Sequence, residues 1–350
     1  MKTNLIGKTS HLPQTLILAV VALISALLGG PKAEARKLQK LNINPEQITI
    51  SGVSSGAFMA VQMHVTYSQI FSGVGSVAGG IYWCSQGQSF LAPSTCMHNP
   101  EQIQVDQYLE HAKSEEKSGL IDPLTNLSRS KVYIFASPED QVVKATGADK
   151  LSAFYEAYLP KENIKSRRDL RSAHGWPTLD YGNPCTKQGL PWLQNCKFDL
   201  AGEMLSSFYP NLKNPNASKL DLPNNLFEFE QKEFGGSEIP MFATGWIYIP
   251  TACQNGASCA LHVTLHGCQM NPNSVQSQFA VHSGFNNWAE ANNIVVLYPQ
   301  TDSQLPSNPY GCWDWYGYTG PNFANKKGPQ MQALKKMVDR VSGSRYRLNR

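Results

Sequence analysis

The stretch from Gln47 to Gln62, QITISGVSSGAFMAVQ, constrains the fold of this chain more than any other. Its first half has the β-branched character of a buried strand, supplied by Ile48, Ile50 and Val53. Its second half, AFMAVQ, is compatible with a helix that continues beyond it. The sequence therefore predicts a strand that turns tightly into a helix.

The turn carries the motif Gly-x-Ser-x-Gly, formed by Gly52, Ser54 and Gly56. A serine on a strained strand-to-helix turn exposes its Oγ, and the flanking glycines let the chain pass close beside it. The helix that follows adds amide donors and a favourable dipole where an oxyanion would form. A chance match is the alternative in a chain with 27 glycines, but the strand and helix context favours a nucleophilic serine.

The N-terminal segment has the pattern of a secretory signal. Lys2 and Lys8 precede an apolar run from Leu16 to Leu28, and Ala33-Glu34-Ala35 offers small residues at a cleavage site. An uncleaved membrane anchor is the alternative, but the run is shorter than the roughly 18 to 20 residues that a bilayer span needs. We therefore expect residues 1–35 to be a signal peptide, with no stable membrane anchor after cleavage.

Composition describes an ordinary globular protein, with 41% hydrophobic and 16% charged residues. A chain of 350 residues is long enough for one large domain or two ordinary ones. Its net charge is +4, and cleavage after Ala35 would lower it by two because three lysines and one glutamate leave. A nearly neutral surface gives no reason to expect nucleic acid as a partner.

The eight cysteines all lie beyond the predicted signal, as expected for an oxidising compartment. Local pairing would join Cys84 with Cys96, Cys185 with Cys196 and Cys253 with Cys259, leaving Cys268 and Cys312. Eight cysteines allow about 105 connectivities, so the sequence leaves the pairing open. A zinc site is the alternative, but the chain has no Cys-x-x-Cys and no His cluster at ligand spacing.

Two later strand ends supply candidate partners for Ser54. The predicted strand Lys131–Ser137 leads to Asp140, and the short polar strand Lys165–Arg171 leads to His174. Strand ends of this kind lie on one edge of a parallel sheet, and the chain order Ser, Asp, His is that of α/β-hydrolases. His174 would take the Ser54 proton and return it to the leaving group, while Asp140 would hold the imidazole tautomer.

Both assignments have alternatives. Asp140 could be a solvated turn residue, with Glu139, Asp169 and Asp180 as rival acids. His174 could be a structural loop histidine, although the glycine and proline near it suit a rigid, exposed catalytic loop.

The remaining segments alternate between the two periodicities. Predicted strands are Gly73–Gly80, Phe227–Phe234 paired antiparallel with Met241–Ile249, Ala260–Leu265 and Ile294–Tyr298. Predicted helices are 101–118, Gly147–Leu159, Asp199–Phe208, Val275–Asn292 and Gly328–Val341. Predicted loops are Tyr181–Cys196, rich in Gly, Asn and Pro, and Pro306–Phe323, dense in aromatic residues.

The strand Ala260–Leu265 ends in His266-Gly-Cys268, which offers a second amide donor for an oxyanion hole. In α/β-hydrolases this donor precedes the nucleophile in the chain, whereas here it follows the histidine. A circular permutation explains the order, because the final helix would then end where the Ser54 strand begins. We therefore expect residues 36–350 to form one circularly permuted α/β-hydrolase domain, with a mostly parallel sheet flanked by helices.

Seven segments together resemble the extracellular poly(3-hydroxybutyrate) depolymerases of the single-domain, circularly permuted type known from fungi. They are SGVSSGAFMA, SPEDQVV, AHGWPT, DYGNPC, NCKFDLAGEML, LHGCQMN and YGCWDWY. The resemblance implies Ser54, Asp140 and His174 as the catalytic triad, and the backbone amides of Ser55 and Cys268 as the oxyanion hole.

The same resemblance suggests a Cys268–Cys312 bridge, which would pin the oxyanion loop beside the aromatic loop. It also suggests Trp313 as a wall of the substrate crevice, with ordinary core packing as the alternative reading of the aromatic loop. We see no carboxy-terminal substrate-binding domain or Thr-rich linker of the kind many bacterial depolymerases carry. Polymer adsorption would then depend on the surface of the catalytic domain.

These features predict a secreted, extracellular or periplasmic serine esterase that acts on a hydrophobic polyester or its oligomers through an acyl-enzyme. The mechanism requires no metal or organic cofactor, and we expect a monomer. A secreted feruloyl or acetyl xylan esterase is the second hypothesis, because related sequences share the scaffold. A catalytically silent secreted binding protein is the third.

Overall fold

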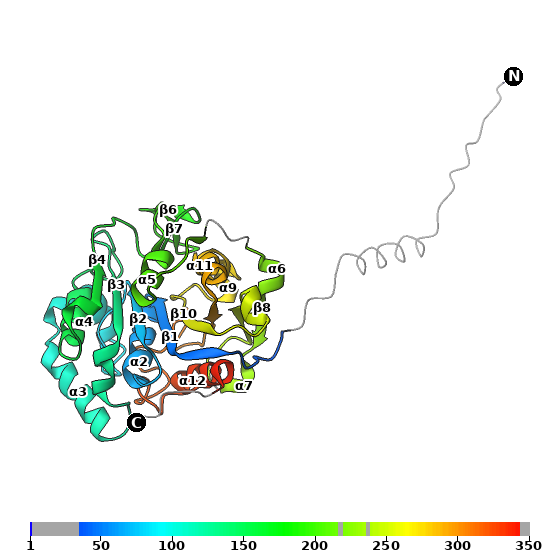
Figure 1. Ribbon diagram of the computed structural model, residues 1–350. Coiled ribbons are helices and arrows are strands. Elements are labelled where there is room, and N and C mark those ends of the chain that lie inside the picture. Colours follow the sequence, from blue (N-terminus) through cyan, green and yellow to red (C-terminus); the bar gives the residue numbers. More distant parts are fainter. Residues whose placement is uncertain (2–34, 216–219, 236–238, 344–350) are drawn as a thin grey trace. The chain divides into compact units, whose positions relative to one another are not determined.

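An eight-stranded sheet with the order β4-β3-β2-β1-β10-β11-β9-β8 runs through the protein (Figure 1). The computed structural model describes residue 1 and residues 35–215, 220–235 and 239–343. The strands are β1 (Ile43–Val53), β2 (Gly73–Val77), β3 (Lys131–Phe135), β4 (Ile164–Arg167), β8 (Leu226–Glu230), β9 (Thr244–Tyr248), β10 (Cys259–Leu265) and β11 (Ile294–Tyr298). Strands β4, β3, β2, β1, β10 and β11 are parallel to one another. Strand β9 is antiparallel to both of its neighbours, β11 and β8.

The first strand of the chain lies inside the sheet, between β2 and β10. The segment just before this strand contacts the last described helix, α12 (Pro329–Ser342). There the backbone N–H of Leu41 donates to the carbonyl oxygen of Val341 at 2.8 Å. The chain therefore begins its domain beside the helix that ends it. This confirms the predicted circular permutation of an α/β-hydrolase fold.

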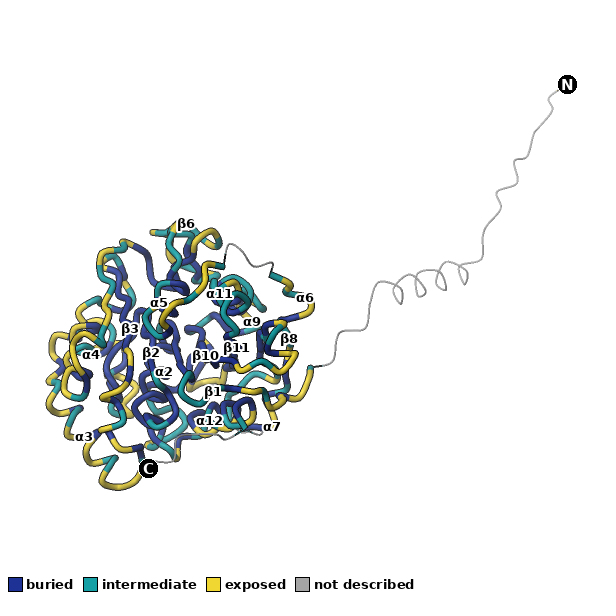
Figure 2. Tube along the Cα trace, viewed as in Figure 1, coloured by how far each residue is buried: buried dark blue, intermediate teal, exposed yellow. Residues whose placement is uncertain are grey.

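Helices cover both faces of the sheet, as Figure 1 shows for α2 and α12 on one face and α5 and α11 on the other. Successive strand residues point to opposite faces. On β3, Val132 and Ile134 therefore join the core under α2 and α12, whereas Tyr133 and Phe135 join the core under α5 and α11. Figure 2 shows the central strands buried along most of their length. The described residues from Arg36 onward group into one compact unit.

The helices have the following bounds. The α-helices are α2 (Ser55–Thr66), α3 (Val105–Lys117), α4 (Gly147–Glu156), α5 (Leu200–Phe208), α6 (Leu222–Asn225), α7 (Lys232–Gly235), α8 (Thr251–Gln254), α9 (Pro272–Val275), α10 (Gln278–His282), α11 (Phe285–Asn292) and α12. The π-helix η1 (Ala92–His98) and the 3-10 helices η2 (Pro100–Gln102), η3 (Leu124–Arg129) and η4 (Lys161–Asn163) complete the set of described helices. Within the described ranges, no helix has the length and apolar character needed to cross a membrane.

Each strand predicted for the main sheet is present, several of them ending earlier than predicted, and β8 and β9 form the predicted antiparallel pair. The single helix predicted over Val275–Asn292 is wrong. The chain instead forms α9, α10 and α11, because Gln276 and Gly284 take positive φ angles of 53° and 92° and interrupt the helix.

The segment Tyr181–Cys196 is not wholly irregular, contrary to the prediction. It supplies β6 (Asn183–Pro184) and β7 (Leu193–Asn195), which form a small parallel sheet with β5 (Trp176–Thr178). The Cys185–Cys196 disulfide closes this segment. The predicted signal peptide, apart from residues 1 and 35, lies outside the described residues.

Four disulfides are present, and they join the predicted pairs. They are Cys84–Cys96, Cys185–Cys196, Cys253–Cys259 and Cys268–Cys312. Three of them close short loops, whereas Cys268–Cys312 spans 44 residues and ties the loop after β10 to the aromatic loop.

Candidate active site

Ser54 lies on a strained turn between β1 and α2, with φ 56° and ψ −122°. Its backbone N–H donates to the carbonyl oxygen of Val77 at the end of β2, at 2.9 Å. A Cβ at Gly52 would lie 2.3 Å from the backbone carbon of Gly56, so only glycine fits there. The Gly-x-Ser-x-Gly motif therefore forms the predicted strand-turn-helix elbow.

Gly56 allows the end of β10 to cross the first turn of α2 at very short range. A Cβ at Gly56 would lie 2.3 Å from the carbonyl oxygen of Leu265 and 2.4 Å from that of His266. One residue further, a Cβ at Gly267 would lie 3.3 Å from the Cβ of Ser54. The loop that carries Cys268 is thus held directly beside the serine.

The two predicted oxyanion donors are the backbone amides of Ser55 and Cys268. Ser55 is the first residue of α2, where helical N–H groups have no partner within the helix. In the part of the chain that the structure describes, neither amide donates a hydrogen bond to another protein group. Both N–H groups are therefore available to an oxyanion, and the assignment stays a prediction.

Asp140 and His174 form a buried pair. The His174 Nδ1 lies 2.7 Å from the Asp140 Oδ2, and the two residues are 6% and 3% exposed. The other carboxylate oxygen, Oδ1, accepts the backbone N–H groups of Val142 and Val143 at 2.8 and 2.9 Å. With the carboxylate on Nδ1, the Nε2 of His174 is left to act as a base.

The histidine loop is anchored to the acid turn by Ser137. The Ser137 Oγ accepts the backbone N–H of Ser172 at 2.9 Å and donates to its carbonyl oxygen at 2.7 Å. On the far side, the Gln194 Nε2 donates to the carbonyl oxygen of His174 at 2.7 Å. The loop is therefore fixed by side-chain hydrogen bonds on both sides of His174.

The rival acids lie elsewhere. Asp180 is exposed, and Glu139 forms an ion pair with Arg171. Asp169 is also exposed and pairs with Arg167 at 3.0 Å. Of the four candidate acids, Asp140 is the one that contacts His174.

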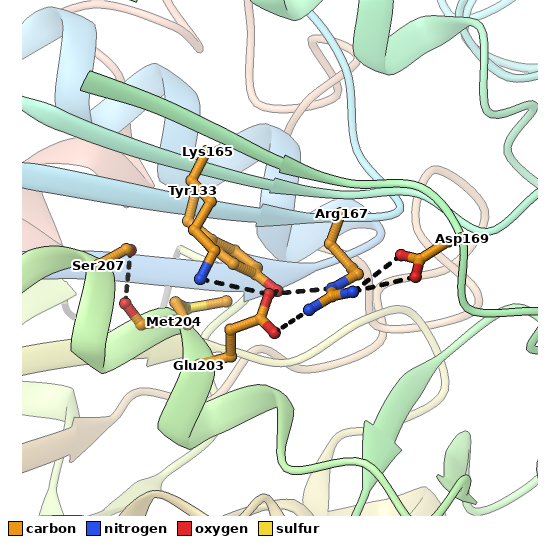
Figure 3. Close-up of polar contacts among 7 residues, drawn as sticks. All are labelled: Tyr133, Lys165, Arg167, Asp169, Glu203, Met204 and Ser207. Carbon is orange, nitrogen blue, oxygen red and sulfur yellow. Dashed lines mark hydrogen bonds and ion pairs between the residues drawn. The ribbon is translucent and has the colours of Figure 1, made fainter. Parts of the chain in front are cut away.

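Asp169 belongs to a cluster of charged and polar groups at the edge of the sheet, shown in Figure 3. The Glu203 carboxylate of α5 lies at its centre and is paired with Arg167 of β4. It also accepts the Tyr133 hydroxyl at 2.9 Å and lies 3.6 Å from the Lys165 ammonium. The cluster attaches α5 to β3 and β4, the strands that lead to the acid turn and the histidine loop.

A cavity of about 490 Å³ opens at Ser54 and His174. Its wall is mainly apolar and includes Phe58, Met97, Val143, Trp192, Met270 and Trp315. Ser54 and His174 both line it, although no hydrogen bond joins them in the described structure. Such contacts are often long before a substrate binds. The Cys268–Cys312 disulfide also lines the cavity.

Trp313, the predicted crevice wall, is fully buried and is not among the cavity-lining residues. Trp315 lines the cavity instead and stacks on Phe58 with a centroid distance of 4.2 Å. Asp314 sets this arrangement, because its buried carboxylate accepts the backbone N–H groups of Gly317 and other residues of the aromatic loop. Burial raises the pKa of Asp314, and these donors oppose that shift.

Sequence reasoning missed Gln194 and Met270 as well as Trp315. The dense aromatic loop was the available signal for Trp315, whereas a single Gln or Met in a loop carries none. Among the described residues, no group of three or more His, Cys, Asp or Glu side chains is arranged to hold a metal ion.

Comparisons with known proteins identify relatives of the whole chain. The chain is 44% identical over 91% of its length to a poly(3-hydroxybutyrate) depolymerase of Delftia acidovorans, and it spans 64% of that protein's length. It is 32% identical over 90% of its length to a polyhydroxybutyrate depolymerase of Talaromyces funiculosus, of which it covers 95%. No family model matches the chain.

A solved structure of a PHB depolymerase variant complexed with an R3HB trimer superposes on this one with a TM-score of 0.82. The identity is 32%, and the match covers 88% of this chain and 99% of the other. Sequence and architecture thus agree over nearly the whole compared length, so the chain belongs to the poly(3-hydroxybutyrate) depolymerase family.

Proposed function

We propose that this protein is a secreted serine esterase that hydrolyses ester bonds of poly(3-hydroxybutyrate) or its oligomers. The observation that carries the proposal is the placement of Ser54 on a strained turn, at a largely apolar cavity that the Asp140–His174 pair also reaches. Relatives that share the fold are named as depolymerases of this polyester, and one is complexed with an R3HB trimer.

In the first half of the reaction, His174 Nε2 takes the proton of the Ser54 hydroxyl as its Oγ attacks an ester carbonyl of the chain. The oxyanion that forms accepts hydrogen bonds from the amides of Ser55 and Cys268. His174 then protonates the leaving alkoxide, and the hydroxyl-terminated fragment departs. Asp140 holds the Nδ1–H of His174 throughout and stabilises the imidazolium.

In the second half, His174 removes a proton from water, whose oxygen attacks the acyl-enzyme ester of Ser54. His174 then returns this proton to the Ser54 Oγ as the bond to the acyl carbon breaks, which releases the acid end of the chain and restores the free enzyme. The mechanism uses no metal or organic cofactor. The apolar wall formed by residues such as Phe58 and Trp315 suits a polyester backbone with few hydrogen-bond donors.

Secretion is part of the proposal. Residues 1–35 would be a cleaved signal peptide, and residues 36–350 the catalytic domain. Four disulfides support folding in an oxidising compartment, extracellular or periplasmic. The protein would act as a monomer, without nucleic acid and without a membrane anchor.

The test compares the wild-type protein with Ser54→Ala on three substrates: R-3-hydroxybutyrate oligomers, methyl ferulate and acetylated xylan. We expect wild-type turnover of the oligomers, loss of at least about 10⁴-fold in kcat in the variant, and a fluorophosphonate adduct on Ser54 alone. Turnover of only methyl ferulate or acetylated xylan would assign a carbohydrate esterase instead. Absence of both turnover and labelling in folded protein would indicate a silent binding protein.

A further inference from the structure

His266 is a buried histidine beside the candidate site that the proposed triad does not use. It follows β10 directly and is 0% exposed. Its ring lies 5.7 Å from that of Trp313, between the end of β10 and the aromatic loop. A fully buried polar ring is expected to have a partner at each nitrogen, and His266 has both.

The two partners determine which nitrogen carries the proton. The backbone N–H of Thr301 points at Nε2 with an N–N distance of 3.1 Å. Because a backbone amide can only donate, Nε2 accepts and carries no hydrogen. Nδ1 therefore holds the proton of the neutral ring and donates to the carbonyl oxygen of Gly267 at 2.7 Å. Burial lowers the pKa of His266 to about 4, which keeps the ring neutral near pH 7.

The carbonyl of Gly267 and the amide of Cys268 belong to the same peptide unit. That unit is planar, so a hydrogen bond that holds its oxygen also fixes the direction of its N–H. A carbonyl that accepts a hydrogen bond is polarised, which makes the N–H of the same unit a stronger donor. We propose that His266 is a positioning residue for the oxyanion hole, which it serves by orienting and polarising the Gly267–Cys268 peptide.

The partner on the other nitrogen gives the ring a rigid support. Thr301 lies in the loop after β11 and is 0% exposed, and its hydroxyl donates to the carbonyl oxygen of Gly311. The next residue, Cys312, is bonded to Cys268 through the disulfide. His266 is therefore connected to Cys268 by two routes: directly through the Gly267 carbonyl, and through Thr301, the aromatic loop and the Cys268–Cys312 disulfide.

Two substitutions separate the two hydrogen bonds. In His266→Asn, the side-chain amide nitrogen can take the place of Nδ1 and still donate to Gly267. In His266→Gln, the longer side chain reaches the position of Nε2, where its oxygen can accept from Thr301, but the donor to Gly267 is lost. Both variants lose ring volume, so folding stability and activity are measured separately.

The proposal rests on the proposed esterase function and is tested with 4-nitrophenyl butanoate and an R-3-hydroxybutyrate trimer. We expect kcat to fall about 10- to 100-fold in His266→Gln, with KM nearly unchanged, because removal of an oxyanion donor itself costs about 10²- to 10³-fold. His266→Asn should retain kcat to within about fivefold, since it keeps the donor to Gly267. The rate at which a fluorophosphonate labels Ser54 should likewise fall more in His266→Gln than in His266→Asn.

His64→Gln is the matched control, because His64 is an equally buried histidine that bonds Tyr155 and Ser130 away from the cavity. It should lose stability but keep the kcat of the folded enzyme. Equal kcat losses in His266→Asn and His266→Gln, or no loss in either, would overturn the positioning role. Failure of the esterase function itself would look different, because wild-type protein would then neither turn over ester nor label at Ser54.

Discussion

On one side of the cavity, backbone packs against backbone, whereas on the other side, side chains hold the loops. The nucleophile side comprises β1, Ser54, α2, β10 and residues 266–270, and a Cβ at Gly56 would lie 2.3 Å from the Leu265 carbonyl oxygen. The acid–base side comprises the Asp140 turn and the His174 loop, which are joined through Ser137 and the 2.7 Å contact of Asp140 with His174.

The difference fits the chemistry proposed for each side. The nucleophile side supplies a serine on a strained turn and fixed amide donors, which act best when they need no reorganisation. In the proposed mechanism the acid–base side passes a proton between Ser54 and a leaving group, which requires a correctly held tautomer rather than a rigid backbone. Substitutions should therefore affect the two sides differently: the catalytic groups of the acid–base side should mainly change kcat, whereas changes in the packed backbone of the nucleophile side should mainly lower folding stability.

The largest effect is expected for Asp140→Asn. The amide can still approach His174 but favours the wrong imidazole tautomer, so kcat on the R-3-hydroxybutyrate trimer should fall about 10³- to 10⁴-fold while the fold is retained. Steady-state kinetics and circular dichroism measure the two quantities. Asp169→Asn is the control and should change kcat less than about twofold, because Asp169 is exposed and pairs with Arg167. A similar loss in both variants would contradict the assignment of the acid.

The next effect is expected for Gly56→Ala on the nucleophile side. The new methyl group would clash with the carbonyl oxygens of Leu265 and His266, both of which belong to backbone that cannot move without shifting β10. We expect the free energy of unfolding to fall by about 3 kcal/mol or more, measured by urea denaturation with disulfides intact. Gly147→Ala is the control, since its Cβ would meet no atom closer than 3.5 Å. Equal stabilities would show that the junction is not tightly packed.

The same contrast explains how far the sequence predicts this structure. The Ser54 elbow and the strands beside it are predictable, because Gly52 and Gly56 mark a close approach and the β-branched residues mark buried strands. The circular permutation followed from one chemical requirement, a second oxyanion donor next to Ser54. The elbow and the buried strands are marked by neighbouring residues, so a single stretch of chain is enough to detect each of them.

Other features depend on contacts between distant segments. No local periodicity tells Trp313 from Trp315, since the Asp314 carboxylate and its loop partners decide which ring lines the cavity. The break at Gly284 occurs where a Cβ on that residue would lie 3.3 Å from the Cβ of Ala201 on α5, a proximity that the regular pattern of 275–292 does not reveal. The two- and three-residue strands β6 and β7 are too short to show alternation.

Acid should weaken the nucleophile side through its buried histidines. His64 on α2 and His262 on β10 are both fully buried, and burial lowers the pKa of each to about 3 from 6.5. Their unfolded forms take up protons as the pH falls below 6.5, while the folded forms stay neutral until about pH 3. Stability is therefore full above pH 6.5 and is lost progressively below it, by about 2 kcal/mol per histidine at pH 5.

Urea denaturation at pH 7 and pH 5 measures this loss. In His64→Gln, the decrease in unfolding free energy between the two pH values should be smaller than in the wild-type protein by about 2 kcal/mol, because one proton-linked group is gone. His98→Gln should show the wild-type decrease, since His98 is exposed. An unchanged decrease in His64→Gln would mean that His64 is not the source of the pH dependence.

The smallest effect is expected for Ser137→Ala on the acid–base side. Loss of the hydroxyl leaves the backbone N–H and carbonyl of Ser172 without this partner in a buried position, which should lower the unfolding free energy by about 1 to 2 kcal/mol. Ser152→Ala, which removes only an exposed bond to Glu156, should cost less than about 0.5 kcal/mol.

Kinetics of Ser137→Ala then test whether the side-chain bonds hold His174 or only stabilise its loop. Because Ser172 is two residues before His174, we expect kcat to fall a few fold while KM changes little. The urea concentration at the midpoint of unfolding should fall in the same variant. A kcat loss as large as that of Asp140→Asn would mean that the Ser137 link determines the position of the Asp140–His174 pair. An unchanged kcat would instead place the whole support of His174 on Asp140 and on the Gln194 bond to its carbonyl oxygen.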